Sequence, residues 1–133
     1  MPASERLRFR VGTAGTPRRK VVLVVDDDPS WRHVLALELE ELGYEPLLAE
    51  DGEQALRLLQ EVDCSVVLLD LRMPGLDGLE VIARLPPGAP RVVLLTAAGM
   101  DEVQPALATG PHYYLPKTAG RDKLALMLQS LDA

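Results

Sequence analysis

Short apolar runs alternate along this chain with longer segments in which apolar residues recur at helical spacing. The runs are rich in Val and Leu and are bounded by turn residues, which is typical of strands buried on both faces of a parallel sheet. The predicted strands cover residues 21–25, 46–49, 66–69, 92–95 and 113–116. Crossovers between parallel strands are almost always right-handed, so the pattern predicts an α/β fold, with a doubly wound sheet between two layers of helices.

Helix boundaries are marked by capping residues and by apolar stripes. Asp28 followed by Pro29 predicts the start of the first helix, and Gly43 predicts its end. A second helix is predicted from near Gly52, a third over about 76–85, and a last one over about 120–131. The stripes expected to face the sheet are Trp31, Val34, Leu35 and Leu42 in the first helix, Ala55, Leu58, Leu59 and Val62 in the second, and Leu124, Met127, Leu128 and Leu131 in the last.

The fourth helix is the least regular of the predicted elements. It must lie between Gly99 and Gly110, and Pro105 divides that segment. A proline inside a helix removes a hydrogen bond and clashes with the preceding turn. We therefore expect this helix to be short or irregular.

Polar side chains follow four of the predicted strands at the points where these strands end. They are Asp26 and Asp27 after the first strand, Asp70 after the third, Thr96 after the fourth and Lys117 after the fifth. Ligands of doubly wound sheets bind beyond the carboxyl ends of the strands. We expect these five residues to meet at one edge of the sheet.

The residue types at this edge predict phosphoryl chemistry with a divalent cation. Clustered carboxylates raise one another's pKa unless a cation lies among them, and Mg2+ prefers carboxylate, water and phosphate oxygens. With the cation present, Asp70 has the chemistry of a nucleophile that carries an acyl phosphate. Thr96 can donate its hydroxyl to one phosphoryl oxygen, and Lys117 can pair with another. Asp28 is expected to cap a helix and not to bind metal.

Four motifs, taken in chain order, carry a family resemblance. They are Val-Val-Asp26-Asp27-Asp28-Pro29, Leu-Leu-Asp70-Leu-Arg72-Met-Pro74-Gly75-Leu-Asp77-Gly78, Leu-Leu-Thr96-Ala97 and Tyr114-Leu-Pro-Lys117. They resemble the acidic pair, phosphoacceptor loop, switch threonine and lysine of bacterial response regulator receiver domains of the single-domain type. The resemblance covers about residues 20–131 and implies a flavodoxin-like sheet of order 2-1-3-4-5.

The resemblance also implies a role for each residue of the site. Asp70 would be the phosphoacceptor, and Mg2+ would be bound by Asp27, Asp70, the backbone carbonyl of Arg72 and, through water, Asp26. Thr96, Ala97 and Lys117 would bind the phosphoryl group, with Ala97 leaving room for it, and Thr96 and Tyr114 would form the switch. The donor would be a histidine kinase or a phosphotransfer protein. Since no output domain is expected after Leu131, the signal would pass to a partner protein.

One position of the lysine motif departs from the family pattern. In the family a proline usually follows the lysine through a cis bond, but here Thr118 follows Lys117 and Pro116 precedes it. A cis bond before a residue other than proline costs roughly 3–4 kcal/mol, so we expect a trans peptide. Because Pro116 has no N–H group, its strand should lie at the edge of the sheet.

Length and charge indicate the domain organisation. The chain has 133 residues, which suits one domain, and we interpret residues 20–133 as the receiver domain and residues 1–19 as a flexible basic arm. Residues 1–20 carry a net charge of +5 and the whole chain −6, so residues 21–133 carry −11. We expect no nucleic-acid binding by this acidic domain. The arm is either a solvated tail or a contact for nucleic acid or an acidic partner.

Several classes of site have no support in the sequence. Cys64 is the only cysteine, so neither an internal disulfide nor a thiolate metal cage is expected. His33 and His112 stand alone and are assigned no role. The sequence contains no apolar run long enough for a membrane span and no apolar signal segment, so no membrane contact is expected and the predicted location is the cytoplasm.

Two other functions stay open at this point. One is a receiver-like adaptor that keeps the fold but signals without phosphorylation, as the irregular fourth helix and the lysine loop allow. The other is an aspartate-nucleophile phosphatase or phosphotransferase. Such an enzyme needs a second acid two residues after the nucleophile, where Arg72 stands, and a cap over its substrate, for which no insertion exists. The expected chemistry is therefore phosphorylation and dephosphorylation of the protein itself, without an external substrate.

Overall fold

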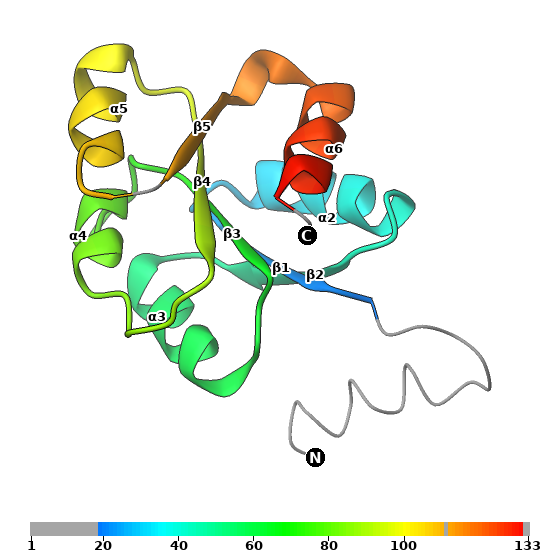
Figure 1. The fold of residues 1–133 in the computed structure, drawn as a ribbon, viewed down its shortest axis with the longest axis horizontal. Coiled ribbons are helices and arrows are strands. Elements are labelled where there is room, and N and C mark those ends of the chain that lie inside the picture. The colour runs from blue at the N-terminus through cyan, green and yellow to red at the C-terminus, as the bar shows by residue number, and fades with distance from the viewer. Residues whose placement is uncertain (1–18, 111, 132–133) are drawn as a thin grey trace.

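The computed structural model describes residues 19–110 and 112–131 and has a five-stranded parallel sheet between two layers of helices (Figure 1). The strands are β1 (Val21–Val25), β2 (Glu45–Ala49), β3 (Val66–Leu69), β4 (Arg91–Thr96) and β5 (Tyr113–Pro116). Their order in the sheet is β2-β1-β3-β4-β5. The predicted flavodoxin-like topology is confirmed. The predicted basic arm lies outside the described residues, apart from Arg19.

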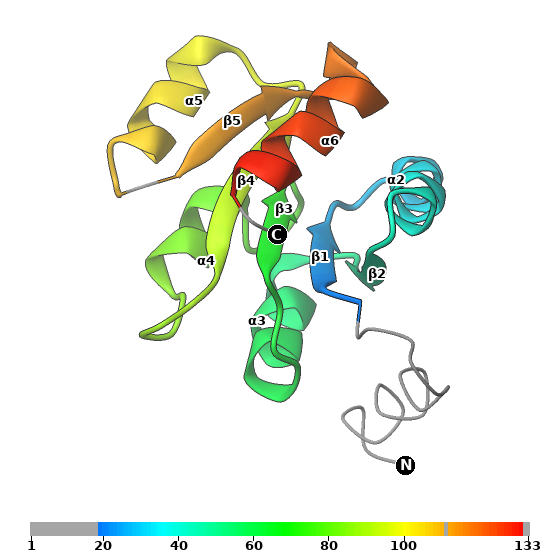
Figure 2. The ribbon, with the colours of Figure 1, turned by 45° about the vertical axis from the view of Figure 1, so that its right-hand side comes forward.

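Helices cover both faces of this sheet (Figure 2). They are α2 (Pro29–Glu41), α3 (Gly52–Glu61), α4 (Gly78–Ala83), α5 (Met100–Leu107) and α6 (Arg121–Ser130), with the short 3-10 helix η1 (Lys117–Ala119) after β5. α3, α4 and α5 pack on one face, and α2 and α6 pack on the other. Within the described ranges, no helix is long and apolar enough to cross a membrane.

The central strands are apolar throughout because both of their faces are covered. In β1, Leu23 and Val25 join the core on the face of α3, α4 and α5, whereas Val22 and Val24 join the core on the face of α2 and α6. Successive side chains of a strand point to opposite faces, so each layer receives alternate residues. This packing orients the strand ends that carry the polar residues.

Helix α2 begins where the sequence predicts and buries only part of the predicted stripe. The Asp28 side chain accepts hydrogen bonds from the backbone N–H groups of Ser30 and Trp31, at 2.9 and 3.4 Å, so its predicted capping role is confirmed. The buried residues are Leu35 and Leu39, whereas Val34 is 43% exposed. The expectation for Val34 was wrong. Residues four apart lie on one face of a helix, and Val34 is about 100° away from Leu35 around the axis.

The helices after β3 and β4 are short. Helix α4 begins only at Gly78, because Asp77 forms a capping box with Glu80 in which each side chain accepts from the other residue's backbone N–H. Helix α5 starts at Met100 and contains Pro105. The expected short fourth helix is therefore present, with an interior proline.

The chain around Lys117 agrees with the expectations for its two neighbours. No peptide bond is cis in the described residues, so the bond from Lys117 to Thr118 is trans. Strand β5 lies at the edge of the sheet, where Pro116 pairs with Thr96 in the register. An edge strand tolerates proline because the missing backbone N–H can face away from the neighbouring strand.

Candidate functional site

The carboxyl ends of β1, β3, β4 and β5 bring four predicted site residues into contact. Asp70 lies at the centre, and the Thr96 hydroxyl donates to its Oδ1 at 2.8 Å. The Lys117 ammonium lies 3.3 Å from Asp70 Oδ2 and 2.6 Å from Asp26 Oδ2. Asp26, Asp70 and Thr96 are buried. The predicted meeting of these side chains at one edge of the sheet is thus present in the structure.

The buried Asp26 and the partly buried Lys117 form an ion pair, and the pKa values of both partners are raised. Burial raises the pKa of Asp26, although the hydrogen bond with Lys117 and the backbone N–H of Asp28 act in the opposite direction. Burial lowers the pKa of Lys117, but the hydrogen bond with Asp26 and the charges of Asp70 and Asp26 outweigh it, so this pKa is raised overall. The ammonium is therefore firmly protonated beside Asp70.

Three carboxylates at this edge lie close enough together to hold a metal ion. One oxygen from each of Asp26, Asp27 and Asp70 lies within 4.8 Å of the others. Asp27 is exposed to solvent, whereas Asp26 and Asp70 are buried. All three supply hard oxygen ligands, which fit Mg2+, and buried like charges favour a cation between them. The residues present thus fit this metal.

The loop after Asp70 returns close to the aspartate because Gly78 has no side chain. A Cβ atom at Gly78 would lie 2.5 Å from the backbone oxygen of Asp70 and 2.7 Å from Cα of Leu71. Gly75 has a φ of +74°, which only glycine adopts freely. The returning loop places the backbone N–H of Arg72 3.3 Å from Asp70 Oδ1, to which it donates.

Thr96 is held in place by its own loop. The backbone N–H of Ala98 donates to Thr96 Oγ1 at 3.0 Å, and the hydroxyl in turn donates to Asp70. Ala97 directly follows β4 and is exposed. Tyr114 pairs with Leu94 in the register, and its partly buried side chain packs against the core of the α3, α4 and α5 face.

Sequence reasoning missed three contacts around the site. The Arg32 side chain donates to the backbone oxygen of Asp26 at 2.7 Å, and the Lys117 ammonium lies 5.4 Å from the centre of the Trp31 ring. Arg72 Nε lies 3.0 and 3.1 Å from the two carboxylate oxygens of Glu102 in α5. The closeness of Arg32 to Asp26 in the chain was the only available signal, because no local pattern links Trp31 with Lys117 or Arg72 with Glu102.

Comparisons with known sequences identify the family. The model of the response regulator receiver domain matches residues 22–129. The positive alginate biosynthesis regulatory protein of Pseudomonas aeruginosa is 41% identical over 112 residues, which cover 81% of this chain and 45% of that protein. The DNA-binding response regulator MtrA of Mycolicibacterium smegmatis is 37% identical over 101 residues, which cover 74% of this chain and 44% of MtrA. The chain therefore spans less than half the length of these relatives.

Solved structures agree with the sequence comparisons. Response regulator TrrA of Thermotoga maritima, in complex with Mg2+ and BeF, is 35% identical, with a TM-score of 0.76 over 84% of this chain and 98% of TrrA. Chemotaxis protein CheY4 of Vibrio cholerae is 28% identical, with a TM-score of 0.73 over 85% of this chain and 98% of CheY4. Because the family model matches most of the chain and these solved structures share its fold, this chain belongs to the response regulator receiver domain family.

Proposed function

We propose that this chain accepts a phosphoryl group on Asp70 from a phosphohistidine donor and carries it as an acyl phosphate. The observation that carries the proposal is the arrangement around Asp70, where one carboxylate oxygen meets the Thr96 hydroxyl at 2.8 Å and the other meets the Lys117 ammonium at 3.3 Å. Fixed donors of this kind stabilise charge that develops on a transferred group. The donor protein is a histidine kinase or a phosphotransfer protein of a two-component system or phosphorelay.

The proposed transfer is a displacement at phosphorus. A carboxylate oxygen of Asp70 forms a bond to phosphorus while the bond from phosphorus to the donor imidazole nitrogen breaks, and the imidazole keeps that electron pair. Lys117 and the Thr96 hydroxyl then pair with phosphoryl oxygens, and the methyl group of Ala97 leaves room for them. This is positioning and charge stabilisation, the main contributions in phosphoryl transfer.

Mg2+ is the cofactor in this proposal, and this chain supplies its ligands. Asp27, Asp70 and the backbone carbonyl of Arg72 would hold the ion directly, and Asp26 would act through water. When bound, Mg2+ neutralises negative charge on the carboxylates and on the phosphoryl oxygens. The carboxylate oxygens within 4.8 Å of one another support this assignment.

Signalling in this proposal depends on a switch formed by Thr96 and Tyr114. In the structure the Thr96 hydroxyl donates to Asp70 Oδ1. A phosphoryl group would draw it away from that oxygen, and Tyr114 in the neighbouring strand would follow. The signal then passes to a partner protein in the cytoplasm.

The direct test is phosphorylation of the full chain by acetyl phosphate with Mg2+, followed by intact mass measurement. We expect addition of one phosphoryl group to the wild type and none to Asp70→Asn. Asp122→Asn is the matched control, because Asp122 is an exposed aspartate of α6, away from the site. A wild type that stays unmodified would overturn the proposal and favour a receiver-like adaptor that signals without phosphorylation.

A further inference from the structure

The Lys117 ammonium contacts three groups of the described residues. Two are the carboxylates of Asp26 and Asp70, at 2.6 and 3.3 Å. The third is the aromatic ring of Trp31, whose centre lies 5.4 Å from the ammonium nitrogen. A cation within about 6 Å of a ring centre is attracted by the electron density of the ring face, and tryptophan gives the strongest attraction.

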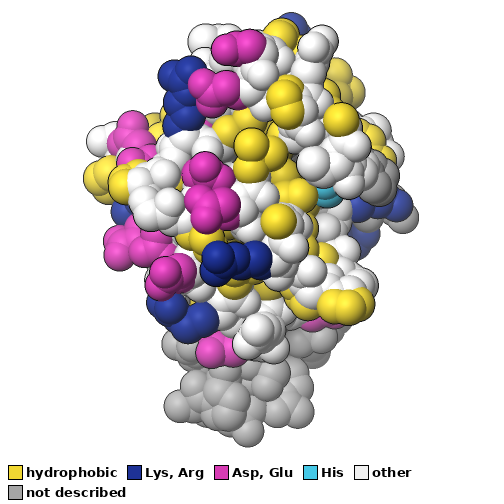
Figure 3. Space-filling view, turned by 90° about the vertical axis from the view of Figure 1, so that its left-hand side faces the viewer, with side chains coloured by type: hydrophobic (Ala, Val, Ile, Leu, Met, Phe, Trp, Pro, Cys, Tyr) yellow, Lys and Arg dark blue, Asp and Glu magenta, His cyan; other side chains and the backbone are white. Residues whose placement is uncertain are grey.

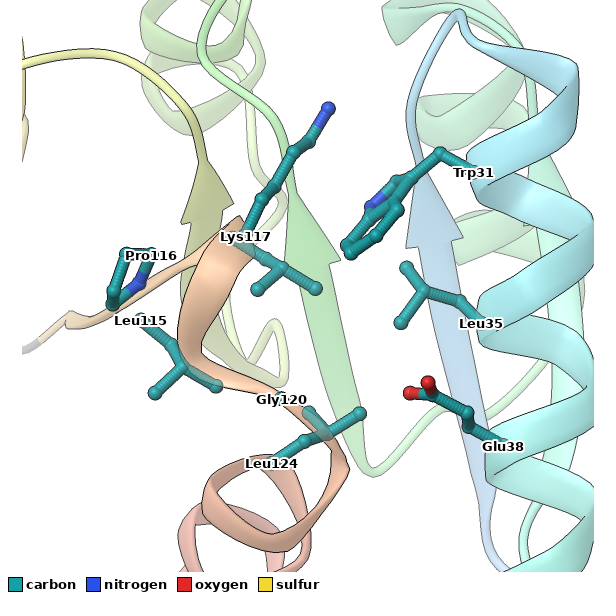
Figure 4. Close-up of a pocket in the computed structure, with 9 residues that line it drawn as sticks. Trp31, Leu35, Glu38, Leu115, Pro116, Lys117, Gly120 and Leu124 are labelled. Atoms are coloured by element: carbon teal, nitrogen blue, oxygen red, sulfur yellow. The ribbon is translucent and has the colours of Figure 1, made fainter.

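Trp31 and Lys117 come from different elements, and the Trp31 ring lies close enough to attract the Lys117 ammonium. Trp31 lies in the first turn of α2, and Lys117 follows the edge strand β5, so the two side chains approach each other over the carboxyl ends of the strands between them (Figure 4). Both line a cavity of about 30 Å³, which is also lined by Leu35 and Leu124.

The ring of Trp31 is oriented by packing and not by a hydrogen bond. Its Nε1 atom is buried and has no hydrogen-bond partner in the described part of the chain. The ring also packs against the core of the α2 and α6 face. The polar atom of the indole is therefore not needed for its position, and another aromatic side chain can present the same face to the ammonium.

The carboxylates and the ring differ in their relation to a bound metal. Asp26 and Asp70 pair with Lys117, yet the same two carboxylates belong to the candidate cation site. When their charge is shared with a divalent cation, their hold on the ammonium weakens, and the two cations repel each other. The ring face offers no metal ligand, so its attraction for the ammonium persists.

We propose that Trp31 is a positioning residue for Lys117, holding the ammonium beside Asp70 while the carboxylates bind Mg2+. This inference rests on the proposed function of Lys117 as a phosphoryl-binding group. Holding a lysine in place also reduces the entropy lost when its flexible side chain engages the phosphoryl group. The ring thereby favours both the transfer and the binding of a phosphoryl mimic.

The test compares Trp31→Leu, which removes the ring, with Trp31→Phe, which keeps an aromatic face. Both variants remove volume from the same site, so a packing defect alone affects both. With acetyl phosphate and saturating Mg2+, we expect phosphorylation of the Leu variant to be roughly five- to tenfold slower than the wild type, and that of the Phe variant to be within about twofold. Calorimetry should show beryllofluoride affinity falling by a similar factor in the Leu variant only, with Mg2+ affinity unchanged in both.

The outcomes separate this inference from the proposed function. A phosphorylated wild type together with a Leu variant of wild-type rate and affinity would overturn the role of Trp31 and leave the role of Asp70 intact. Equal losses in the Leu and Phe variants would show a packing role and would also overturn it. A wild type that is not phosphorylated at all would overturn both. Thermal unfolding of each variant with Mg2+ confirms that the comparison is made between folded proteins.

Discussion

At the scale of single residues, the neighbours Asp26 and Asp27 have opposite surroundings. Asp26 is 2% exposed and pairs with Lys117, whereas Asp27 is open to solvent. Successive residues at the end of a strand point in opposite directions, so only one of the two can enter the sheet edge beside Lys117. Asp27 is the solvent-facing acid of the proposed Mg2+ site, and Asp28, the third acid, caps the helix.

This division of roles predicts different effects for two adjacent substitutions. Asp27→Ala should weaken Mg2+ binding by roughly tenfold or more, because it removes a charged oxygen ligand. Asp28→Ala should leave Mg2+ affinity nearly unchanged and lower the free energy of unfolding by about 1 kcal/mol, because it removes a helix cap. Calorimetry with Mg2+ and urea unfolding measure the two quantities. Equal Mg2+ affinity in Asp27→Ala and the wild type would show that the metal assignment is wrong.

The raised pKa of Asp26 predicts how the free energy of unfolding depends on pH when metal is removed by a chelator. Its pKa is raised in the folded protein above the ordinary value of 3.8, mainly by burial. The folded state therefore binds this proton more tightly than the unfolded state, so the contribution of Asp26 to stability falls as pH rises from about 3.8 through the raised pKa.

Asp26→Asn should accordingly be more stable than the wild type at pH 7 in chelator. Lys117 keeps Asp70 as a partner in this variant. The gain should shrink as the pH is lowered through the raised pKa toward 3.8, and below 3.8 it should change no further, because the wild-type carboxyl is then neutral in both the folded and the unfolded state. Urea unfolding at several pH values gives the difference directly. A gain that grows toward low pH would contradict the assigned direction of the pKa shift.

At the scale of elements, α5 contains an interior proline and forms an ion pair with the loop after Asp70. Pro105 cannot donate a hydrogen bond to the carbonyl of Asp101, one turn earlier in the helix. The ion pair between Arg72 and Glu102 joins the loop after Asp70 to the first turn of α5. This helix is therefore weakened internally and is connected directly to the loop that carries the site.

We expect α5 to be the least protected helix in hydrogen exchange. Amides of Val103 to Ala108 should exchange faster than those in the centre of α2, because local unfolding of α5 costs less. Pro105→Ala should slow their exchange and raise the free energy of unfolding by about 2 kcal/mol, since alanine favours a helix interior but loses the stiffness of proline in the unfolded chain. Wild-type protection in α5 equal to that in α2 would refute this prediction.

At the scale of the whole molecule, charge separates the folded domain from the segment before it. Residues 21–133 carry a net charge of −11, whereas residues 1–20 carry +5. The face shown in Figure 3 has acidic side chains interspersed with Lys and Arg around apolar patches. A net negative domain repels the phosphate backbone of nucleic acids.

The charge separation predicts that the domain does not bind duplex DNA. A chain starting at Lys20 should show no change in the anisotropy of a labelled duplex, even at low salt, where electrostatic attraction is strongest. The full chain in parallel measures what residues 1–19 add. Salt-sensitive binding by the shortened chain would show that a basic surface of the folded domain had been overlooked.

The sequence by itself determined the strands, their ends and the local caps. The runs in β1 and β3 are apolar at every position, and that pattern requires burial on both faces whatever the partners are. Asp70 and Lys117 lie where such runs end, so their meeting follows from the parallel sheet alone. The cap by Asp28 is also local, because its donors lie two and three residues ahead.

Only the tertiary structure decided which way each helix faces and which distant residues touch. Apolar residues occur on several sides of α2, so the sequence alone does not distinguish Val34 from Leu39 as the buried residue. The packing of the helix on the sheet decides that Leu39 is buried. The contact of Trp31 with Lys117 joins elements from opposite ends of the chain. Such contacts depend on the relative position of packed layers, and no periodicity within one element encodes that position.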